Sequence, residues 1–392
     1  MARFSKFSSI SLLFLTVLII LSLPACTNIS GAAKSSTSLS NFLGFSELPD
    51  WYIRNKYSYA DSKWIKNDFG TAIHYRDVGK GPVVLLIHGE ISSLQTWDKW
   101  IDNLSLSFRV IALDLPGSGL TTAPKCIEYP EDSCPENLTP EYLTHTLEYF
   151  IEDLHLDKFS LVGSSYGGYL AAQYASKIHP EKVENLILLS PMGYQQKLPW
   201  ILNYVTTSGM DIFNRYIQPS SIITTIVDNF YGDKSKIQRV NLERYIHLAQ
   251  SDGGHESTVR QLSFVRNLME HGMLLDLSKI TAPTLLMWGK KDTWGDYEHA
   301  DLWKEAIPNV TRVDFILAGH ALMEEMPDET SADAIAFIKH EPLPSVEGLG
   351  TGGTFTIDEA VGDLDKEALF GKDKSSDKKT DANSNSDTQP NK

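Results

Sequence analysis

Short apolar runs recur through the middle of the 392-residue chain, and helix-like segments separate them. The runs are mostly continuous rather than alternating, which is typical of strands that are buried on both faces of a sheet. Between them, apolar residues recur at helical spacing, most clearly over residues 142–156. Strands that alternate with helices predict an α/β fold with a mostly parallel sheet. Strands are predicted over 73–78, 83–87, 110–113, 159–162, 186–189, 284–287 and 313–317.

This rhythm stops between about Met192 and Leu277, where aliphatic and aromatic residues fall into helix-like stretches. The change predicts a helical insertion, whose apolar side chains form either a core of their own or the lining of a pocket. The tail is poor in apolar residues after Phe370, which predicts disorder. The expected divisions are a signal over 1–25, a spacer and arm over 26–60, a sheet domain over 61–193 plus 278–341, a helical insertion over 194–277 and a flexible tail over 342–392.

The segment Gly163–Gly168 reads Gly-Ser-Ser-Tyr-Gly-Gly and contains the pattern Gly-x-Ser-x-Gly centred on Ser165. It joins a predicted strand to a predicted helix, so it predicts a sharp turn with the serine at its tip. Small neighbours allow the chain to pack closely around such a turn. The helix that follows offers free N–H groups where negative charge can develop. An ordinary serine at a helix N-terminus fits the same local pattern.

A candidate acid and a candidate base follow Ser165 along the chain. Asp292 and His320 each lie in the loop just past a predicted strand. A serine becomes a strong nucleophile when a histidine takes its proton and a carboxylate orients that histidine. The order serine, aspartate, histidine therefore predicts a catalytic triad. Asp296 is the alternative acid, and His88 is the rival histidine, although its place after a buried strand favours a role in stabilising a loop.

Taken together, these motifs resemble those of the α/β-hydrolases, in the branch that carries a cap domain. The resemblance covers roughly residues 73–339, and its motifs stand in the family's order. They are His88-Gly89, Asp114-Leu115-Pro116-Gly117-Ser118-Gly119, the turn at Ser165, Asp292 and His320. The resemblance implies the α/β-hydrolase fold, a mostly parallel central sheet flanked by helices, with the insertion as a helical cap over the serine. Such motifs are poorly specific for the substrate.

The resemblance also implies roles around the serine. Ser165 would attack the substrate, His320 would act as its base, and Asp292 would hold the imidazole in one tautomer. The backbone N–H groups of Glu90 and Tyr166 would bind the oxyanion. An acidic side chain aimed at that negative charge would be unfavourable, so we expect the Glu90 carboxylate to turn away or to be hydrogen-bonded.

Two tryptophans and two glutamates near the motifs can also be assigned expected positions. Trp97 and Trp294 are candidates for lining the pocket, because each lies beside a motif. Glu324 and Glu325, just past the candidate base, are expected to be solvated. Neither a metal site nor a cofactor is expected.

The activity that the resemblance favours is a serine esterase that cleaves carboxylic esters of small molecules through an acyl-serine intermediate. An aminopeptidase or amide hydrolase on the same triad is one alternative, for which the negative charge of Glu90 could bind a substrate amine. A C–C bond hydrolase is a second alternative. A noncatalytic ligand-binding protein of the same fold is the third.

The first residues predict export and lipid attachment. Arg3 and Lys6 precede an apolar stretch over 10–23, which is shorter than the about 20 residues that a membrane span needs. The end of this stretch, Leu23-Pro24-Ala25-Cys26, resembles the lipobox of bacterial lipoproteins. That likeness implies acylation of Cys26 and anchoring in a lipid bilayer of the cell envelope. Thr27 favours the outer membrane, should the organism have two, because aspartate there is usual for inner-membrane retention. A plain signal peptide and a soluble protein are the alternative.

The remaining cysteines indicate the redox compartment. The net charge indicates which partners are disfavoured. Cys126 and Cys134 lie a short loop apart in a chain with an export signal, which predicts a disulfide, with two unpaired thiols as the alternative. The formal net charge of -15 at pH 7 argues against binding to nucleic acid and against electrostatic attraction to anionic lipid.

Overall fold

The computed structural model describes residues 47–67, 70–121, 138–214 and 216–347. The expectations for Cys26, for the pair Cys126 and Cys134, and for the signal, spacer and tail fall outside these residues.

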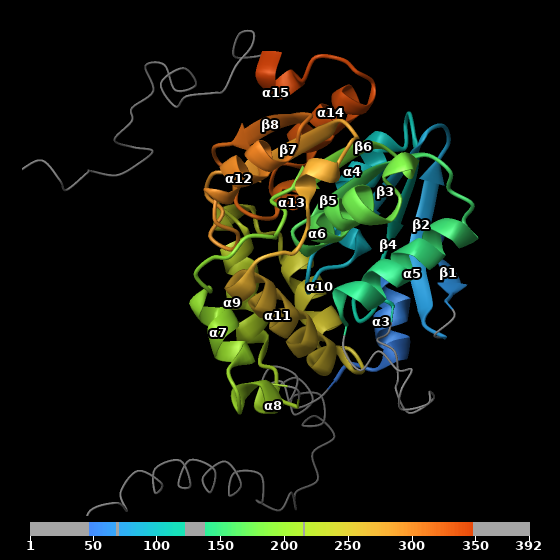
Figure 1. Cartoon of the computed structure of the whole chain (residues 1–392). Coiled ribbons are helices and arrows are strands. Elements are labelled where there is room, and N and C mark those ends of the chain that lie inside the picture. The colour runs from blue at the N-terminus through green and yellow to red at the C-terminus, as the bar shows by residue number, and fades with distance from the viewer. Residues whose placement is uncertain (1–46, 68–69, 122–137, 215, 348–392) are drawn as a thin grey trace, which may run out of the picture.

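An eight-stranded sheet runs through the molecule in the order β1-β2-β4-β3-β5-β6-β7-β8 (Figure 1). The pairs β1–β2 and β2–β4 are antiparallel, and the remaining neighbours pair in parallel. The mostly parallel sheet predicted from the apolar runs is therefore confirmed. The strands are β1 Lys63–Lys66, β2 Ala72–Gly79, β3 Val83–Ile87, β4 Arg109–Leu113, β5 Phe159–Ser164, β6 Val183–Leu189, β7 Thr284–Gly289 and β8 Val310–Phe315.

Each predicted strand is present, and its residues explain why. In the central strands the apolar side chains face helices on both sides, and Leu85, Val162 and Ile187 are fully buried. Strand β1 was not predicted, because three of its four residues are exposed at the sheet edge and no buried face imposes a pattern on them.

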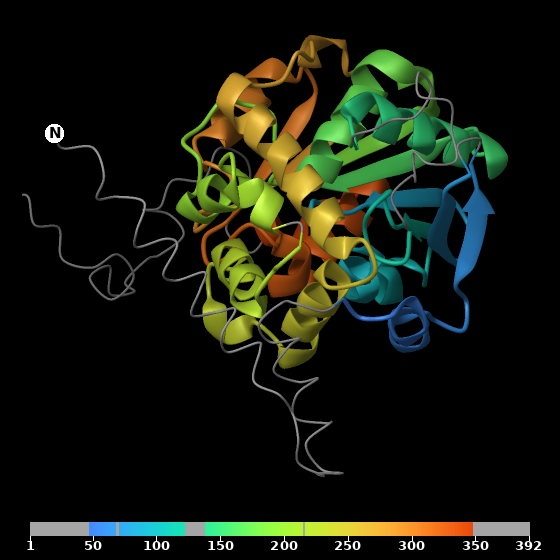
Figure 2. The same ribbon diagram turned by 90° about the horizontal axis from the view of Figure 1, so that it is seen from below.

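Helices cover both faces of the sheet (Figure 2). Helices α4 and α14 pack together on one face, while α5 and α6 pack together on the other. Helix α5 begins where the side chain of Thr139 accepts a hydrogen bond from Tyr142 N–H and proline fills the first helical position. The helices of this domain are η1 Leu94–Trp97, α4 Asp98–Leu104, α5 Pro140–Asp153, α6 Tyr166–Gln173, η3 Tyr174–Ile178, η4 Pro180–Lys182, η6 Leu277–Lys279, α12 His299–Ala306, α13 Leu322–Glu325, α14 Pro327–Ile338 and α15 Pro344–Glu347.

The segment between β6 and β7 forms the helical insertion expected from the break in the strand–helix rhythm (Figure 1). Its apolar stripes pack on one another and on the sheet domain, since Ile223, Ile226 and Leu262 belong to the main buried cluster. Many of its apolar residues are thus core. The insertion contains α7 Trp200–Thr206, α8 Met210–Asn214, α9 Ser220–Phe230, α10 Arg239–Ala249 and α11 Gly254–His271. We refer to it as the cap.

A short arm precedes the sheet and touches both domains. It carries helix α3, Asp50–Tyr57, whose Ile53 packs in a small cluster with Leu120 of the sheet domain and Leu248 of the cap. Leu48 pairs with Ser251 through an isolated bridge, and its N–H donates to Gln250 O. The arm therefore contributes contacts that hold the cap against the sheet domain.

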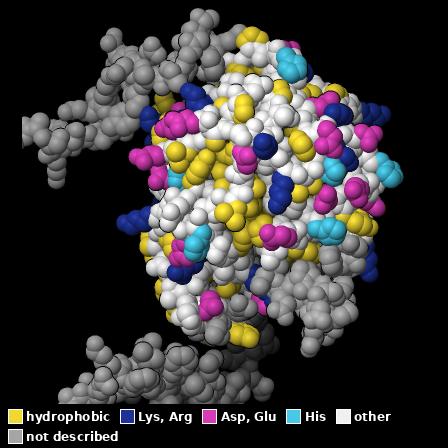
Figure 3. Space-filling model, in the orientation of Figure 1, with side chains coloured by type: hydrophobic (Ala, Val, Ile, Leu, Met, Phe, Trp, Pro, Cys, Tyr) yellow, Lys and Arg dark blue, Asp and Glu magenta, His cyan; other side chains and the backbone are white. Residues whose placement is uncertain are grey.

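Acidic and basic side chains are interspersed over the face seen in Figure 3, and neither kind gathers into a large patch there. Among the described residues, no helix combines the length and the hydropathy required to cross a bilayer.

Candidate active site

Ser165 lies directly after β5, at the tip of the predicted strand–turn–helix. Its backbone adopts φ 55° and ψ -119°, a conformation that is strained for a residue with a side chain. The turn is so tight that a Cβ added at Gly167 would lie 2.4 Å from the carbonyl oxygen of His88. A Cβ at Gly163 would lie 2.3 Å from Gly167 O. The glycines are required because the chain around the serine approaches itself this closely.

The three predicted triad residues meet at this turn. His320 Nε2 lies 2.7 Å from Ser165 Oγ, and His320 Nδ1 lies 2.7 Å from Asp292 Oδ2. The second oxygen of Asp292, Oδ1, accepts backbone N–H bonds from Trp294 at 2.9 Å and Gly295 at 2.8 Å, which fixes the carboxylate. This continuous chain of hydrogen bonds has the arrangement required to activate a serine.

The other candidates for acid and base lie elsewhere. The side chain of Asp296 accepts a hydrogen bond from Glu298 N–H at the surface. His88 is buried, and its Nδ1 contacts Gly89 O at 2.6 Å while its Nε2 accepts the N–H of Leu115 at 3.0 Å. Burial lowers the pKa of this imidazole, which matches the neutral form that such bonds require. The expectation that His88 stabilises a loop is confirmed.

The environment of His320 favours its protonated form. Burial by itself would lower the pKa of the imidazole, but the neighbouring charges of Asp292 and Glu90 outweigh that effect, so its pKa is raised above the ordinary 6.5. The ring of Phe230 lies beside it, with ring centroids 5.6 Å apart. The base is therefore held near two carboxylates in a buried pocket.

The Glu90 carboxylate points towards the nucleophile. We expected its carboxylate to turn away or to be hydrogen-bonded; it is hydrogen-bonded, but it faces the serine. Ser165 Oγ donates to Glu90 Oε2 at 2.9 Å, and Trp294 Nε1 donates to Glu90 Oε1 at 2.5 Å. A hydroxyl carries a single proton, so Glu90 and His320 compete for that of Ser165.

The backbone amides expected to bind an oxyanion flank the serine. Tyr166 is the first residue of α6, so its N–H has no partner within the helix. Glu90 stands three residues after Ile87, the buried end of β3, and its N–H makes no backbone hydrogen bond to any residue that the structure describes. The Tyr166 ring stacks on Tyr169 and contacts Phe264, with centroids 6.0 Å and 4.8 Å away.

A small cavity lies beside Ser165. It has a volume of about 20 Å³, little more than the roughly 10–15 Å³ that one water needs. Its walls include Glu90 and Thr96 from the sheet domain and the aromatic side chains of Phe230 and Tyr245 from the cap. The cap thus closes directly over the serine.

The two tryptophans proposed for the pocket differ in their surroundings. Trp294 does not line the cavity, but it reaches the site from behind Glu90, since it bonds that carboxylate and packs edge-on against Phe230 with centroids 5.1 Å apart. The proposal was wrong for Trp97, which is fully buried against Trp100 in the hydrophobic core and does not line the cavity. Its neighbour Thr96 on η1 does line the cavity, whereas the ring of Trp97 packs into the interior.

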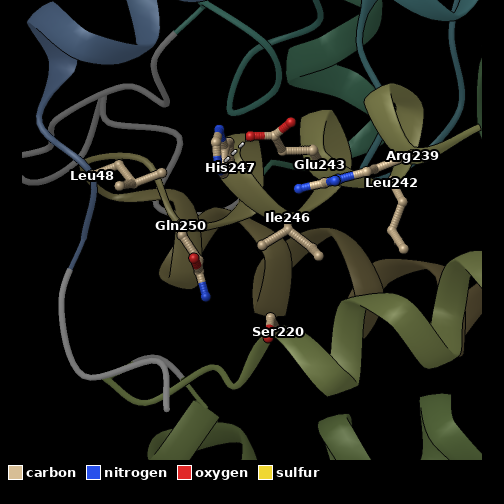
Figure 4. Close-up of a pocket in the computed structure, with 8 residues that line it drawn as sticks. All are labelled: Leu48, Ser220, Arg239, Leu242, Glu243, Ile246, His247 and Gln250. Carbon is tan, nitrogen blue, oxygen red and sulfur yellow. Dashed lines mark ion pairs between the residues drawn. The ribbon is translucent and has the colours of Figure 1, made fainter. Parts of the chain in front are cut away.

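A larger hollow of about 350 Å³ lies on the cap and contains none of the triad (Figure 4). Side chains of α10 form much of its wall, and Leu48 of the arm and Ser220 of α9 complete it. Glu243 and His247 pair there at 3.6 Å. The residues that line this hollow do not form a nucleophile–base pair.

The expectation that Glu324 and Glu325 are solvated was wrong. The Glu324 side chain is 3% exposed and pairs with Arg244 of the cap. It also accepts hydrogen bonds from three hydroxyl groups, those of Thr96 at 2.6 Å, Tyr231 at 2.5 Å and Tyr245 at 3.2 Å. No local pattern indicates this cluster, because its members come from distant segments that only the closed cap brings together.

Glu325 bonds backbone amides on both sides of the cap boundary. Its oxygens accept N–H bonds from Gly319 at 2.7 Å, Gly232 at 3.0 Å and Asp233 at 2.8 Å. Gly319 directly precedes His320, so one carboxylate joins the loop of the base to the end of α9 in the cap. Among the described residues, no group of three or more His, Cys, Asp or Glu side chains is placed to hold a metal ion.

Comparison with known proteins agrees with this geometry. Residues 82–209 match the family model described as the alpha/beta hydrolase fold. The chain is 28% identical to 2-hydroxy-6-oxo-6-(2'-aminophenyl)hexa-2,4-dienoic acid hydrolase of Metapseudomonas resinovorans over 69% of this chain and 89% of that protein. It is 25% identical to bovine (Bos taurus) monoacylglycerol lipase ABHD6 over 66% of this chain and 76% of that protein.

A solved structure shares the fold. A mutant of the meta-cleavage product hydrolase of Pseudomonas fluorescens IP01, complexed with acetates, superimposes with a TM-score of 0.60 at 24% identity, covering 71% of this chain and 97% of that one. The eight-stranded sheet, the helices on both faces and the helical insertion are thus those of the α/β-hydrolase fold.

Proposed function

We propose that this hydrolase of the α/β fold cleaves carboxylic esters through a covalent intermediate on Ser165. The observation that carries the proposal is the unbroken chain of hydrogen bonds from Asp292 through His320 to Ser165 Oγ. A serine in this arrangement can attack a carbonyl carbon, which the same hydroxyl in a plain helix cap cannot do.

In the proposed reaction, Ser165 Oγ forms a bond to the carbonyl carbon while its proton passes to His320 Nε2. The carbonyl oxygen takes up the negative charge, which the N–H groups of Tyr166 and Glu90 stabilise. The C–O bond to the alcohol then breaks, and the proton on His320 goes to the leaving oxygen. Water repeats the sequence on the acyl-enzyme and releases the acid.

The same machinery could act on amides or on C–C bonds, and the names of the relatives include both a lipase and a dienoic acid hydrolase. The ester reaction is favoured because it requires the fewest groups in the site: a nucleophile, a base and two backbone amides. The aromatic walls of the cavity suit the apolar part of a small acyl group.

The test is hydrolysis of 4-nitrophenyl acetate by the purified protein, together with labelling by a fluorophosphonate probe. Ser165→Ala and His320→Ala are each expected to lower kcat by about 10³-fold or more without unfolding the protein. Ser235→Ala, on the exposed surface of the cap, is the matched control and should behave as wild type. Wild-type activity in either triad variant would rule out the proposed nucleophile and base, and a wild-type protein that neither labels nor hydrolyses esters would favour a ligand-binding role.

We further propose that the enzyme is located in the bacterial cell envelope and is anchored to a membrane there by acyl chains on Cys26. The support is the sequence alone: a short apolar stretch after two basic residues, ending in a lipobox-like tetrapeptide. A disulfide between Cys126 and Cys134 would fit the same oxidising compartment.

A further inference from the structure

A buried carboxylate that makes no direct ion pair among the described residues faces the nucleophile. Glu90 is 2% exposed, and it makes no ion pair with any Lys, Arg or His in the described ranges. Its two hydrogen bonds come from neutral groups, the hydroxyl of Ser165 and the indole N–H of Trp294. An ionised carboxylate is costly to bury in this way, because neutral donors replace only part of its hydration.

Two other buried carboxylates, Glu324 and Glu325, have partners that compensate their negative charge. Glu324 is paired with the guanidinium of Arg244, and three hydroxyl groups complete its surroundings. Glu325 accepts three backbone N–H bonds. Within the described part of the chain, Glu90 has neither a cation nor such a ring of amides, so its position is not explained by stability of the fold. Its missing partner can instead come with a ligand.

The walls next to Glu90 suit a cation. The cavity that Glu90 lines is also lined by Phe230 and Tyr245, whose ring centroids lie 6.3 Å apart. Trp294 packs edge-on against Phe230 while it bonds the carboxylate. A carboxylate among aromatic rings is the chemistry that recognises an ammonium group, through charge and through cation–π attraction.

The position of the carboxylate limits where that ammonium group can be. Glu90 Oε2 is 2.9 Å from Ser165 Oγ, the atom that would attack the carbonyl carbon. A cation hydrogen-bonded to Glu90 therefore lies close to the carbonyl carbon, and a group two bonds from that carbon is well within reach of the carboxylate. An α-amino group meets this condition. The cavity, about 20 Å³, holds little more than one water, so a short acyl group requires the least displacement of its walls.

We propose that Glu90 binds the α-ammonium group of the substrate, so that the preferred substrates are esters or amides of small amino acids. The proposal rests on the proposed serine hydrolase and names its substrate class. Binding the cation neutralises Glu90, which removes the charge that would oppose the oxyanion. It also makes the carboxylate a weaker acceptor for the Ser165 hydroxyl, which favours donation of that proton to His320. Charged substrates would therefore be attacked faster, as well as bound more tightly.

The experiment compares two substrates of equal shape, the 4-nitrophenyl ester of L-alanine and 4-nitrophenyl isobutyrate, in which a methyl group replaces the ammonium. At about pH 6, where an α-amino group is charged, wild-type kcat/KM is expected to be roughly 100-fold higher for the alanine ester. Rates are corrected for spontaneous hydrolysis. Glu90→Gln keeps the side-chain shape and the backbone N–H but removes the charge.

In Glu90→Gln, kcat/KM for the alanine ester is expected to fall roughly 100-fold, and that for isobutyrate to rise because no carboxylate opposes the oxyanion. Glu243→Gln is the matched control and should leave the ratio unchanged, because it alters an exposed carboxylate of the cap that pairs with Lys56 of the arm. The proposal is overturned if the wild type handles isobutyrate as well as alanine, or if Glu90→Gln leaves the ratio unchanged.

Fluorophosphonate labelling distinguishes two negative outcomes: that Glu90 does not bind an amine, and that the protein is not a serine hydrolase. A protein that labels at Ser165 and prefers isobutyrate remains a serine hydrolase but does not use Glu90 for an amine. A protein that does not label at all contradicts the serine hydrolase itself. If the Glu90 variant does not fold, a wild type that handles isobutyrate as well as the alanine ester still overturns the proposal.

Discussion

At the scale of single residues, two carboxylates act on the Ser165–His320 pair from different sides. Asp292 bonds His320 Nδ1, and Glu90 lies close enough to raise the pKa of the same imidazole while it accepts the Ser165 hydroxyl. Asp292 stabilises the protonated base on the side where the reaction needs it. Glu90 adds negative charge on the side where the oxyanion would form.

This arrangement predicts the pH dependence of the reaction. The base must be neutral to take the serine proton, and its pKa in the folded protein is raised, so kcat/KM for a neutral ester should fall as pH drops through a midpoint above 6.5. In Glu90→Gln the midpoint should move to lower pH, because a charge that favours the imidazolium is gone. The pH–rate profiles of both proteins measure this, and a midpoint that stays put or rises in the variant would contradict the assigned influence of Glu90.

At the scale of elements, the cap is fastened to the loop that carries the base. The N–H of Ala321, the residue after His320, donates to Phe230 O at the end of α9 at 2.9 Å. Glu325 joins the same two segments, and Glu324 on α13 pairs with Arg244 on α10. Helix α13 thus contacts both the cap and the loop that carries His320, which links the closed cap to the placement of that side chain.

The Glu324 cluster predicts a large effect on stability. Glu324→Ala leaves the buried Arg244 without its carboxylate, and the ring of Tyr245 and the carbonyl of Gln95, which also contact the guanidinium, carry no full charge to replace it. The free energy of unfolding should fall by about 3–5 kcal/mol. Urea denaturation measures it, with Glu329→Ala on the exposed face of α14 as the control. A loss no greater than that of the control would show that the cluster does not hold the cap.

At the scale of the whole molecule, the net charge does not favour electrostatic attraction to anionic lipid. The net charge is -15, and acidic and basic groups are interspersed on the face seen in Figure 3. An association with membranes would then need a source other than charge, such as the acyl chains proposed on Cys26.

The anchor therefore has a direct test. Expressed in a bacterium that processes lipoproteins, the full chain should partition with membranes, and Cys26→Ser should move most of it to the soluble fraction, because the acyl chains are lost. The catalytic control is Ser165→Ala, which should stay with the membranes. Membrane association that survives Cys26→Ser would mean that another part of the chain provides it.

Local patterns in the sequence were sufficient for the framework of this protein. The continuous apolar runs predicted the buried strands, the glycines around Ser165 predicted the tight turn, and the order of Ser165, Asp292 and His320 predicted which side chains meet. The strands and the turn depend on neighbours in the chain and on periodicity, and the triad was predicted from the order of motifs that resembles that of the α/β-hydrolases.

Only the tertiary structure decided which way the side chains around that framework point. Glu90 contacts Trp294 from 204 residues away, and Glu324 meets Arg244 from 80 residues away, so no local pattern could place either carboxylate. Trp97 lies beside a motif in the sequence and yet packs in the core, because its ring turns inward against Trp100. Burial and charge compensation depend on the closed cap, and closure is a property of the folded chain rather than of any segment.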